Sequence, residues 1–186
     1  MTLAFDRPGM QALAVTTKGD GQRMKTTRLD ATDIRILAAI QRHGQLSKSR
    51  LAEIVHLSPT PCWARLTRLK EAGYITGYRG EIALDRIADF TQVVMTVSLA
   101  QHRKADFDRF ESHIATLDEV TDCVATGGGM DYVLRVICPD LASFQGMIDD
   151  LLSGEFGIDR YMTYFVTRRI KSGVPNLAKL ARDRAR

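Results

Sequence analysis

The sequence predicts an α+β protein built from two small domains, because the period of its apolar residues changes once along the chain. Between residues 29 and 72, apolar residues recur at helical spacing beside capping residues. From residue 91 onward, alternating stretches and helical stripes follow one another in the order βαββαβ. A length of 186 residues is sufficient for two such domains.

The first domain, residues 29–78, is expected to contain three short helices. Their predicted N-caps are Asp30, Ser47 and Ser58, and Gly44 and Gly73 end the first and third helices. The residues expected to face the core are Ile34, Leu37, Ile40 or Ala38, Leu51, Ile54, Val55, Cys62, Leu66 and Leu69. The strand-like "YITGYRGEIAL" follows, so the pattern indicates a winged helix-turn-helix, with residues 79–90 as a connector.

The second domain, residues 91–171, is expected to be ferredoxin-like, with a four-stranded antiparallel sheet and two helices on one face. The helical stripes are Phe107, Phe110, Ile114 and Leu117, and then Leu141, Phe144, Ile148 and Leu151. The strands are too apolar for a sheet with one wet face, on the evidence of Val93, Met95, Val97, Tyr132, Leu134, Tyr161 and Phe165. We therefore predict that a second subunit covers the other face.

The third helix is expected to start within "LSPTPCWARLTRL", with Pro59 at the first helical position. Proline is tolerated there because the N–H of that position has no intrahelical partner. If the apolar residues are buried, the hydroxyl groups and cationic side chains point outward. A helix of this kind enters the DNA major groove N-terminus first, with free N–H groups and its positive end directed at phosphate. The candidate DNA-binding residues are Ser58, Thr60, Pro61, Trp63, Arg65 and Arg68. For Trp63, packing is favoured over base contact.

Charge is unevenly distributed along the chain. Residues 79–167 carry 7 basic and 15 acidic groups, whereas residues 168–186 carry 7 basic and 1 acidic. Residues 1–28 are interpreted as a flexible basic leader whose Lys25 and Arg28 add phosphate contacts, and residues 172–186 as a basic tail that is either a weakly helical arm on DNA or a mobile end. These basic segments suggest a polyanionic partner, which is double-stranded DNA.

The chemistry of the remaining side chains points away from a metal site or a cofactor. Cys62, Cys123 and Cys138 form no CxxC pair and have no histidine at zinc-ligand spacing, so they are expected to be free thiols in a reducing compartment. No apolar run is long enough for a membrane span, and charge and proline interrupt the N-terminal segment. The expected location is the cytoplasm.

Residues 29–78 closely resemble the DNA-binding domain of the leucine-responsive regulatory protein/AsnC (Lrp/AsnC) family of transcription regulators. The string "LSPTPC…R…RL…GYI" is the most specific part, and the similarity extends to about residue 171. The resemblance implies a RAM/ACT-like sensing domain, a homodimer with tetramers or octamers as further assemblies, and control of amino-acid metabolism genes, including its own, through a bound amino acid or amino-acid derivative. It also implies that the protein is not an enzyme.

The segment "TGGGMDY" matches the family's effector turn, with one departure. Gly129 stands where that family usually has an acidic residue, which would hold the ammonium of an amino acid. We hypothesise that the effector either lacks a free α-ammonium or has its ammonium held by Asp131 or Asp122. The alternative is a plain tight turn with no ligand. The candidate effector-binding residues are Gly127, Gly128, Gly129, Met130, Asp131 and Tyr132.

Two other functions remain open at this point. An architectural DNA-binding protein without ligand response is compatible with the basic tail. An enzyme similar to the siroheme decarboxylases has the same two-domain architecture, but it requires a clustered acid or base. The four histidines are scattered, at His43, His56, His102 and His113.

Overall fold

A computed structural model describes residues 29–183, so the predicted leader, with Lys25 and Arg28, lies outside the described residues. The chain forms two compact units, which are treated separately below. One comprises residues 83–169; the other comprises residues 29–82 together with residues 170–183. Within 29–183, no helix is both long and apolar enough to cross a membrane.

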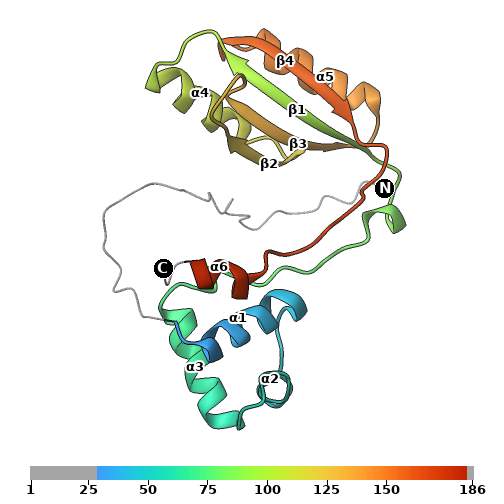
Figure 1. Cartoon of the computed structure of the whole chain (residues 1–186). Helices are drawn as coiled ribbons and strands as arrows, with labels where there is room; N and C mark the ends of the chain where they lie inside the picture. Colours follow the sequence, from blue (N-terminus) through green and yellow to red (C-terminus); the bar gives the residue numbers. More distant parts are fainter. Residues whose placement is uncertain (1–28, 184–186) are drawn as a thin grey trace, which may run out of the picture. The chain divides into compact units, whose positions relative to one another are not determined.

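The helical unit, residues 29–82 with 170–183, begins with three helices, α1 (Ala31–His43), α2 (Lys48–Val55) and α3 (Pro59–Glu71) (Figure 1). All three predicted N-caps are confirmed in position. Asp30 and Asp33 form a reciprocal capping box at α1, and the Ser47 hydroxyl accepts a bond from the N–H of Arg50 at α2. Gly44 and Gly73 have φ of 70° and 73°, which is why the helices end where glycine occurs.

The core between these helices confirms most of the predicted inward residues. Cys62, Leu66 and Leu69 of α3 are buried as predicted. The face predicted for α1 is wrong by part of a turn, because Ile36, Ala39 and Ile40 form the buried face. Ile34, Leu37 and Ala38 are only half-buried and form a second apolar stripe.

The segment after α3 differs from the prediction. Residues 74–83 form no strand, because within the described chain they have no strand to pair with. Tyr74, Ile75 and Tyr78 instead pack against the helical core. The segment therefore completes the core of this unit without forming the hydrogen-bond ladder of a wing.

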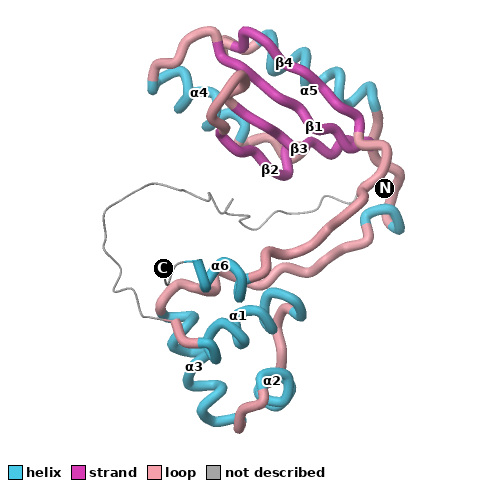
Figure 2. The backbone as a smooth tube through the Cα atoms, in the orientation of Figure 1, coloured by secondary structure: helices cyan, strands magenta, loops and turns pink. Residues whose placement is uncertain are grey.

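The second unit has the predicted ferredoxin-like order. After a short 3-10 helix, η1 (Leu84–Arg86), come β1 (Thr91–Leu99), α4 (Lys104–Ile114), β2 (Val120–Ala125), β3 (Tyr132–Cys138), α5 (Leu141–Ser153) and β4 (Ile158–Phe165). The strands pair antiparallel in the order β2-β3-β1-β4. The helices α4 and α5 lie on one face of the sheet (Figure 2). Leu117 follows the end of α4 but still packs on the core, whereas Leu141 is 49% exposed.

The apolar residues that led us to predict a covered second face do not lie on that face. All seven apolar residues used to predict a covered second face lie on the face that the helices already cover. Val93, Met95 and Val97 are 0% exposed there, and strand pairing places Phe165 and Tyr161 opposite Val93 and Val97. The open face is formed by another set, Val94, Thr96, Val124, Val133, Ile137, Met162 and Tyr164. It is nevertheless apolar, with Tyr164 52% and Val124 47% exposed.

The chain ends in a further helix, α6 (Leu177–Asp183), which contacts α1 (Figure 1). Thus this part of the basic tail is helical and belongs to the same unit as α1, α2 and α3. All three cysteines are free; Cys62 and Cys138 are buried, as predicted for core thiols, and Cys123 is half-buried. Burial raises the pKa of each thiol, that of Cys123 to about 11, so none is a reactive thiolate at neutral pH.

Candidate nucleic-acid interface and effector turn

The turn between α2 and α3 sets the direction of α3. His56 closes α2 in the left-handed conformation, with φ of 56°, and its N–H donates back to the carbonyl of Glu53. Ser58 then starts α3, but its side chain makes no capping bond. The reason is that Pro59 and Pro61 occupy the first and third helical positions, so the N–H at the third position, which a serine cap often binds, is missing.

These prolines also correct the expectation of several free N–H groups at the start of α3. Of the four positions without an intrahelical partner, only Ser58 and Thr60 carry an N–H at all. Ser58, Thr60 and Pro61 are exposed, so this end of α3 presents two hydroxyl groups and an apolar ring. Such groups suit phosphate and base-edge contacts at close range.

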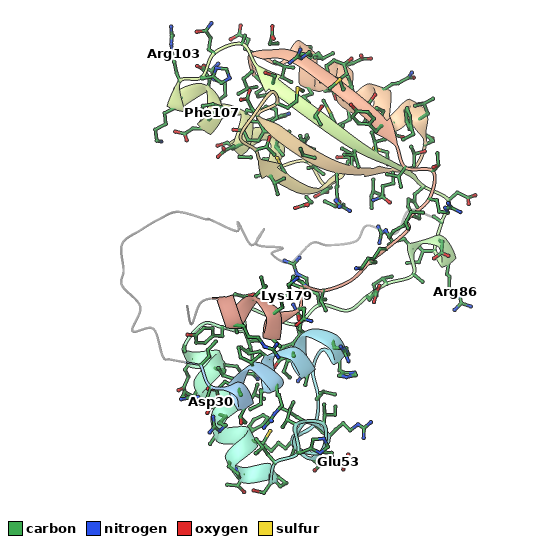
Figure 3. The ribbon with its side chains drawn as sticks, in the orientation of Figure 1. Asp30, Glu53, Arg86, Arg103, Phe107 and Lys179 are labelled. Carbon is green, nitrogen blue, oxygen red and sulfur yellow. The ribbon has the colours of Figure 1, made fainter. Side chains whose placement is uncertain are left out.

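Arg65 and Arg68 are bound to α1. Arg65 Nη1 donates to Asp30 Oδ2 at 2.6 Å and to Asp33 Oδ1 at 2.9 Å, and Arg68 Nη2 donates to Asp33 Oδ2 at 2.7 Å. The Asp33 carboxylate is 1% exposed, whereas the side chains of Arg65 and Arg68 are 34% and 44% exposed. Figure 3 shows Asp30 where α1 begins, beside α3. The two arginines therefore brace the third helix against the first while part of each guanidinium still faces solvent.

The electrostatics of this cluster favour the ionised state. The pKa of Asp30 is lowered by the N–H of Asp33 and by the Arg65 guanidinium, and the pKa of Arg65 is raised by its bonds to Asp30 and Asp33. These contacts therefore favour the charged forms of Asp30 and Arg65. A charged, mutually bonded cluster fixes the distance between α1 and α3.

Trp63 is half-buried against the helical core, as the sequence favours, and two lysines lie over its ring. Lys48 Nζ is 4.4 Å from the ring centroid, and Lys70 Nζ is 5.7 Å from it. These are cation–π distances. Thus Trp63 holds two cations beside α3.

The predicted effector turn joins β2 to β3. The N–H of Thr126 donates to the carbonyl of Asp131 at 2.7 Å, and the N–H of Asp131 donates to the carbonyl of Val97 at 2.9 Å, which ties the turn to β1. Gly127, Gly128 and Gly129 are exposed. Gly128 has a φ of 136°, a conformation that is nearly exclusive to glycine.

Asp131 and Tyr132 anchor this turn to the domain. Asp131 Oδ2 accepts a bond from the N–H of Leu99 at 2.7 Å and lies 3.2 Å from His102 Nε2. The N–H of Leu99, followed by His102, lowers the pKa of Asp131. The predicted effector residue Tyr132 is 2% exposed, and its hydroxyl donates to Glu111 Oε1 at 2.8 Å. Both side chains are therefore occupied by the protein itself.

A residue that the sequence did not single out lies at the exposed side of the turn. Arg160 of β4 donates from Nη2 to the carbonyl of Gly129 at 3.2 Å, and the same nitrogen is 3.8 Å from Met130 Sδ. Strand pairing places Arg160 opposite Ser98 and hence on the open face of the sheet. The turn thus combines exposed glycine backbone with one guanidinium.

Replacing Gly128 with alanine is expected to destabilise this unit by about 2 kcal/mol, because φ of 136° is strained for any residue with a Cβ. Gly127→Ala and Gly129→Ala are matched controls: neither has a positive φ, and a Cβ at either position meets no atom within 4 Å. Urea unfolding followed by far-ultraviolet circular dichroism measures the difference. Equal stability of all three variants would contradict the strained turn.

Comparison with known proteins finds a family model that matches each of the two units. Residues 29–76 match a family model described as winged helix-turn-helix DNA-binding, and residues 92–175 match the Lrp/AsnC ligand binding domain. The transcriptional regulatory protein DoeX of Halomonas elongata is 40% identical over 144 residues, which cover 77% of this chain and 91% of DoeX. The chain belongs to the Lrp/AsnC family. This Lrp/AsnC protein is a DNA-binding transcriptional regulator with a ligand-binding domain.

Other relatives of this Lrp/AsnC regulator agree. The leucine-responsive regulatory protein of Haemophilus influenzae is 31% identical over 150 residues, covering 81% of this chain and 90% of that protein. Among solved structures, the Neisseria meningitidis transcriptional regulator in complex with L-Met has a TM-score of 0.72 at 32% identity, covering 77% of this chain and 93% of that one. The similar proteins named here are all described as regulatory proteins or transcriptional regulators.

Sequence reasoning missed several residues of the two sites. Arg160 gave no signal, because 31 positions separate it from Gly129 and only the pairing of β4 with β1 brings it near. Lys48 lies in α2 and reaches Trp63 only through the fold. For Asp33 a signal existed, since it lies three and seven residues before Ile36 and Ile40 and is thus a charge on the buried stripe.

Proposed function

We propose that this Lrp/AsnC regulator reads specific DNA sites with the first turn of α3 and responds to an anionic amino-acid derivative that lacks a free α-ammonium. The effector binds at the β2–β3 turn, at a site between subunits. The expected targets are promoters of amino-acid metabolism genes, including its own. The observation that carries this proposal concerns two charged groups at the same turn. The Asp131 carboxylate already accepts a hydrogen bond from the N–H of Leu99, whereas the exposed Arg160 guanidinium donates to the carbonyl of Gly129 through one nitrogen.

The DNA-reading part is supported by a difference between the two parts of α3: the first turn is exposed, and the arginines that follow are bonded to α1. Ser58, Thr60 and Pro61 are exposed and available to the major groove, whereas Arg65 and Arg68 brace the helix and direct only part of each guanidinium outward. Trp63 positions Lys48 and Lys70 for phosphate contacts. In this proposal the end of α3 specifies the sequence and the cations add affinity.

The effector part is supported by the charges around the glycine turn. The Asp131 carboxylate already accepts the N–H of Leu99 and lies near Ser98 and His102, so it has little capacity for a ligand ammonium. Asp122 lies opposite Arg135 within the sheet, with its carboxylate 3.9 Å from Arg135 Nε. The charged side chain in direct contact with the glycines is that of Arg160, whose Nη2 lies 3.2 Å from the carbonyl oxygen of Gly129. An anionic group is thus favoured at this turn and an ammonium is not.

Calorimetric titration with L-methionine and N-acetyl-L-methionine tests the effector class, since methionine is the ligand of the Neisseria relative. We expect the acetylated compound to bind at least about tenfold more tightly, and Arg160→Gln to weaken its binding about tenfold through loss of a charge-assisted bond. Arg135→Gln is the matched control, an exposed arginine of the same sheet face opposite Asp122. Binding of free methionine as tight as that of the acetylated compound would contradict the proposal, and an Asp131→Ala and Asp122→Ala double variant would then show whether either carboxylate holds the ammonium.

We further propose that a second subunit covers the open face of the sheet. This face carries the exposed side chains of Val124 at the β2 edge and of Met162 and Tyr164 at the β4 edge, with the half-buried Val133 and Val94 between them on β3 and β1. Tyr164→Lys is expected to raise the dimer dissociation constant at least about tenfold by placing a charge in a desolvated interface. Sedimentation equilibrium measures this constant. Lys104→Ala, in an exposed position of α4 on the other face, is the control and should leave the constant unchanged.

A footprint on the DNA upstream of its own and adjacent genes tests the function as a whole. We expect a protected, roughly symmetric site that survives moderate salt and changes with one acylated amino acid. Phosphate-only binding falls steeply with salt. Extended protection that ignores both sequence and ligand would instead favour the architectural function.

A further inference from the structure

The C-terminal helix α6 lies beyond both segments that match family models, which end at residues 76 and 175. Its start is locally encoded: Pro175 precedes Asn176, whose side-chain oxygen accepts the N–H of Lys179 at 3.1 Å. A helix of 7 residues is too short to be stable alone in water. Packing must therefore hold α6 in the helical state, which raises the question of what it packs against.

The contact partner of α6 is α1, the first helix of the DNA-binding unit. Leu177 and Ala181 lie four residues apart on one face of α6 and are half-buried, whereas Leu180 is 60% exposed. On α1, Ile34, Leu37 and Ala38 lie outside the fully buried face and are also half-buried, and of these Leu37 packs in part against the helical core. The two helices each offer one apolar stripe for this contact.

Charge does not explain the contact. Lys179 and Arg182 of α6 are exposed, and neither forms an ion pair with another described residue. The exposed charges of the facing helix include Arg35 and Arg42, so the two helices carry charge of the same sign. The attraction between α1 and α6 is therefore apolar.

The path of the chain gives this contact a consequence. Residues 83–90 connect the DNA-binding unit to β1 of the ferredoxin-like unit, and residues 166–176 connect β4 back to α6. The returning segment leaves β4 with the N–H of Val166 bonded to the carbonyl of Gln92 at 2.8 Å, so its first residue is fixed to β1. On the other side, α1 carries Asp33, which binds both arginines of α3.

We propose that α6 is a built-in partner for the second apolar stripe of α1, so that each DNA-binding unit is tied to its own sensing domain by two chain segments.

Hydrogen exchange of the full chain, followed by mass spectrometry without DNA or effector, tests this proposal. Leu177→Glu places a charge on the docked face, and Leu180→Glu makes the same change on the exposed face three residues later. We expect the amides of α1 to exchange about fivefold faster in Leu177→Glu and at the wild-type rate in Leu180→Glu. Emission of Trp63, the single tryptophan, should show a Tm about 4 °C lower for Leu177→Glu alone.

Several outcomes would overturn the docking of α6. Wild-type exchange and Tm in Leu177→Glu would show that α6 does not hold α1. The same loss in a Lys179→Gln and Arg182→Gln double variant would make the contact electrostatic. Protection of α1 that disappears on dilution would assign the docked helix to a second copy of the chain. Because neither DNA nor effector is present, none of these results bears on the proposed function.

Discussion

Thr60→Asp is expected to weaken specific DNA binding about 100-fold while leaving the fold intact. Thr60 is exposed at the second helical position of α3, where the proposed interface meets phosphate and base edges. A carboxylate there faces the phosphates as a like charge, which costs several kcal/mol in an interface. At the same time, an acidic residue in the first turn favours a helix by up to about 1 kcal/mol through the helix dipole. Binding and stability should therefore change in opposite directions.

Fluorescence anisotropy with a labelled operator fragment measures the affinity, and thermal unfolding measures the stability. Ala31→Asp is the matched control, because Ala31 is exposed in the first turn of α1 and the change adds the same charge at another helix start. We expect Ala31→Asp to reduce affinity less than about fivefold. An equal loss in the two variants would mean that net charge, and not the first turn of α3, determines binding.

Asp33→Asn is expected to destabilise the DNA-binding unit by about 2 kcal/mol. The change keeps the size of the side chain but removes the buried charge that accepts bonds from Arg65 at 2.9 Å and Arg68 at 2.7 Å. The loss stays below that of a fully buried ion pair because both guanidinium groups are partly solvated and can turn to water. Trp63 emission reports the unfolding of this unit, and its Tm should fall by about 10 °C.

Asp30→Asn is the control for this effect. The Asp30 side chain is 51% exposed, and asparagine is an equally good N-cap, so we expect a loss below about 1 kcal/mol. DNA affinity should fall in Asp33→Asn even below its Tm, because α3 loses its brace. If Asp33→Asn leaves both stability and affinity at the wild-type values, the cluster does not position α3.

Much of this architecture could be predicted because short-range sequence patterns determine where the helices and strands begin and end. Capping residues and glycines marked the ends of α1, α2 and α3, and the order of the six elements in the second unit followed from their alternating periods. Periodicity was less reliable where a helix has two apolar faces. In α1 the stripe containing Ile34 and Leu37 resembles a core face, but Ile36 and Ile40 are the buried ones. Docking of α6, as proposed above, accounts for the apolar character of the other stripe.

The sites depended more on contacts that no local pattern encodes. An arginine at a helical surface has the same sequence signature whether it faces DNA or a carboxylate, so the bonds of Arg65 and Arg68 to Asp33 were not predictable. Similarly, alternation along a strand shows that two faces exist but not which one the helices cover. That is why the prediction of a covered second face was based on Val93 and Met95, which the helices already cover, and not on Val94, which lies on the open face.

The two prolines at the start of α3 have a consequence for how fast and at what entropic cost the protein engages an operator. Their rings hold φ near its helical value at Pro59 and Pro61, so the end of α3 that we propose contacts DNA has a restricted, helical backbone before any partner binds. Little ordering entropy is then lost at this turn on docking. We therefore expect collision with the major groove, and not folding of a recognition segment, to limit association.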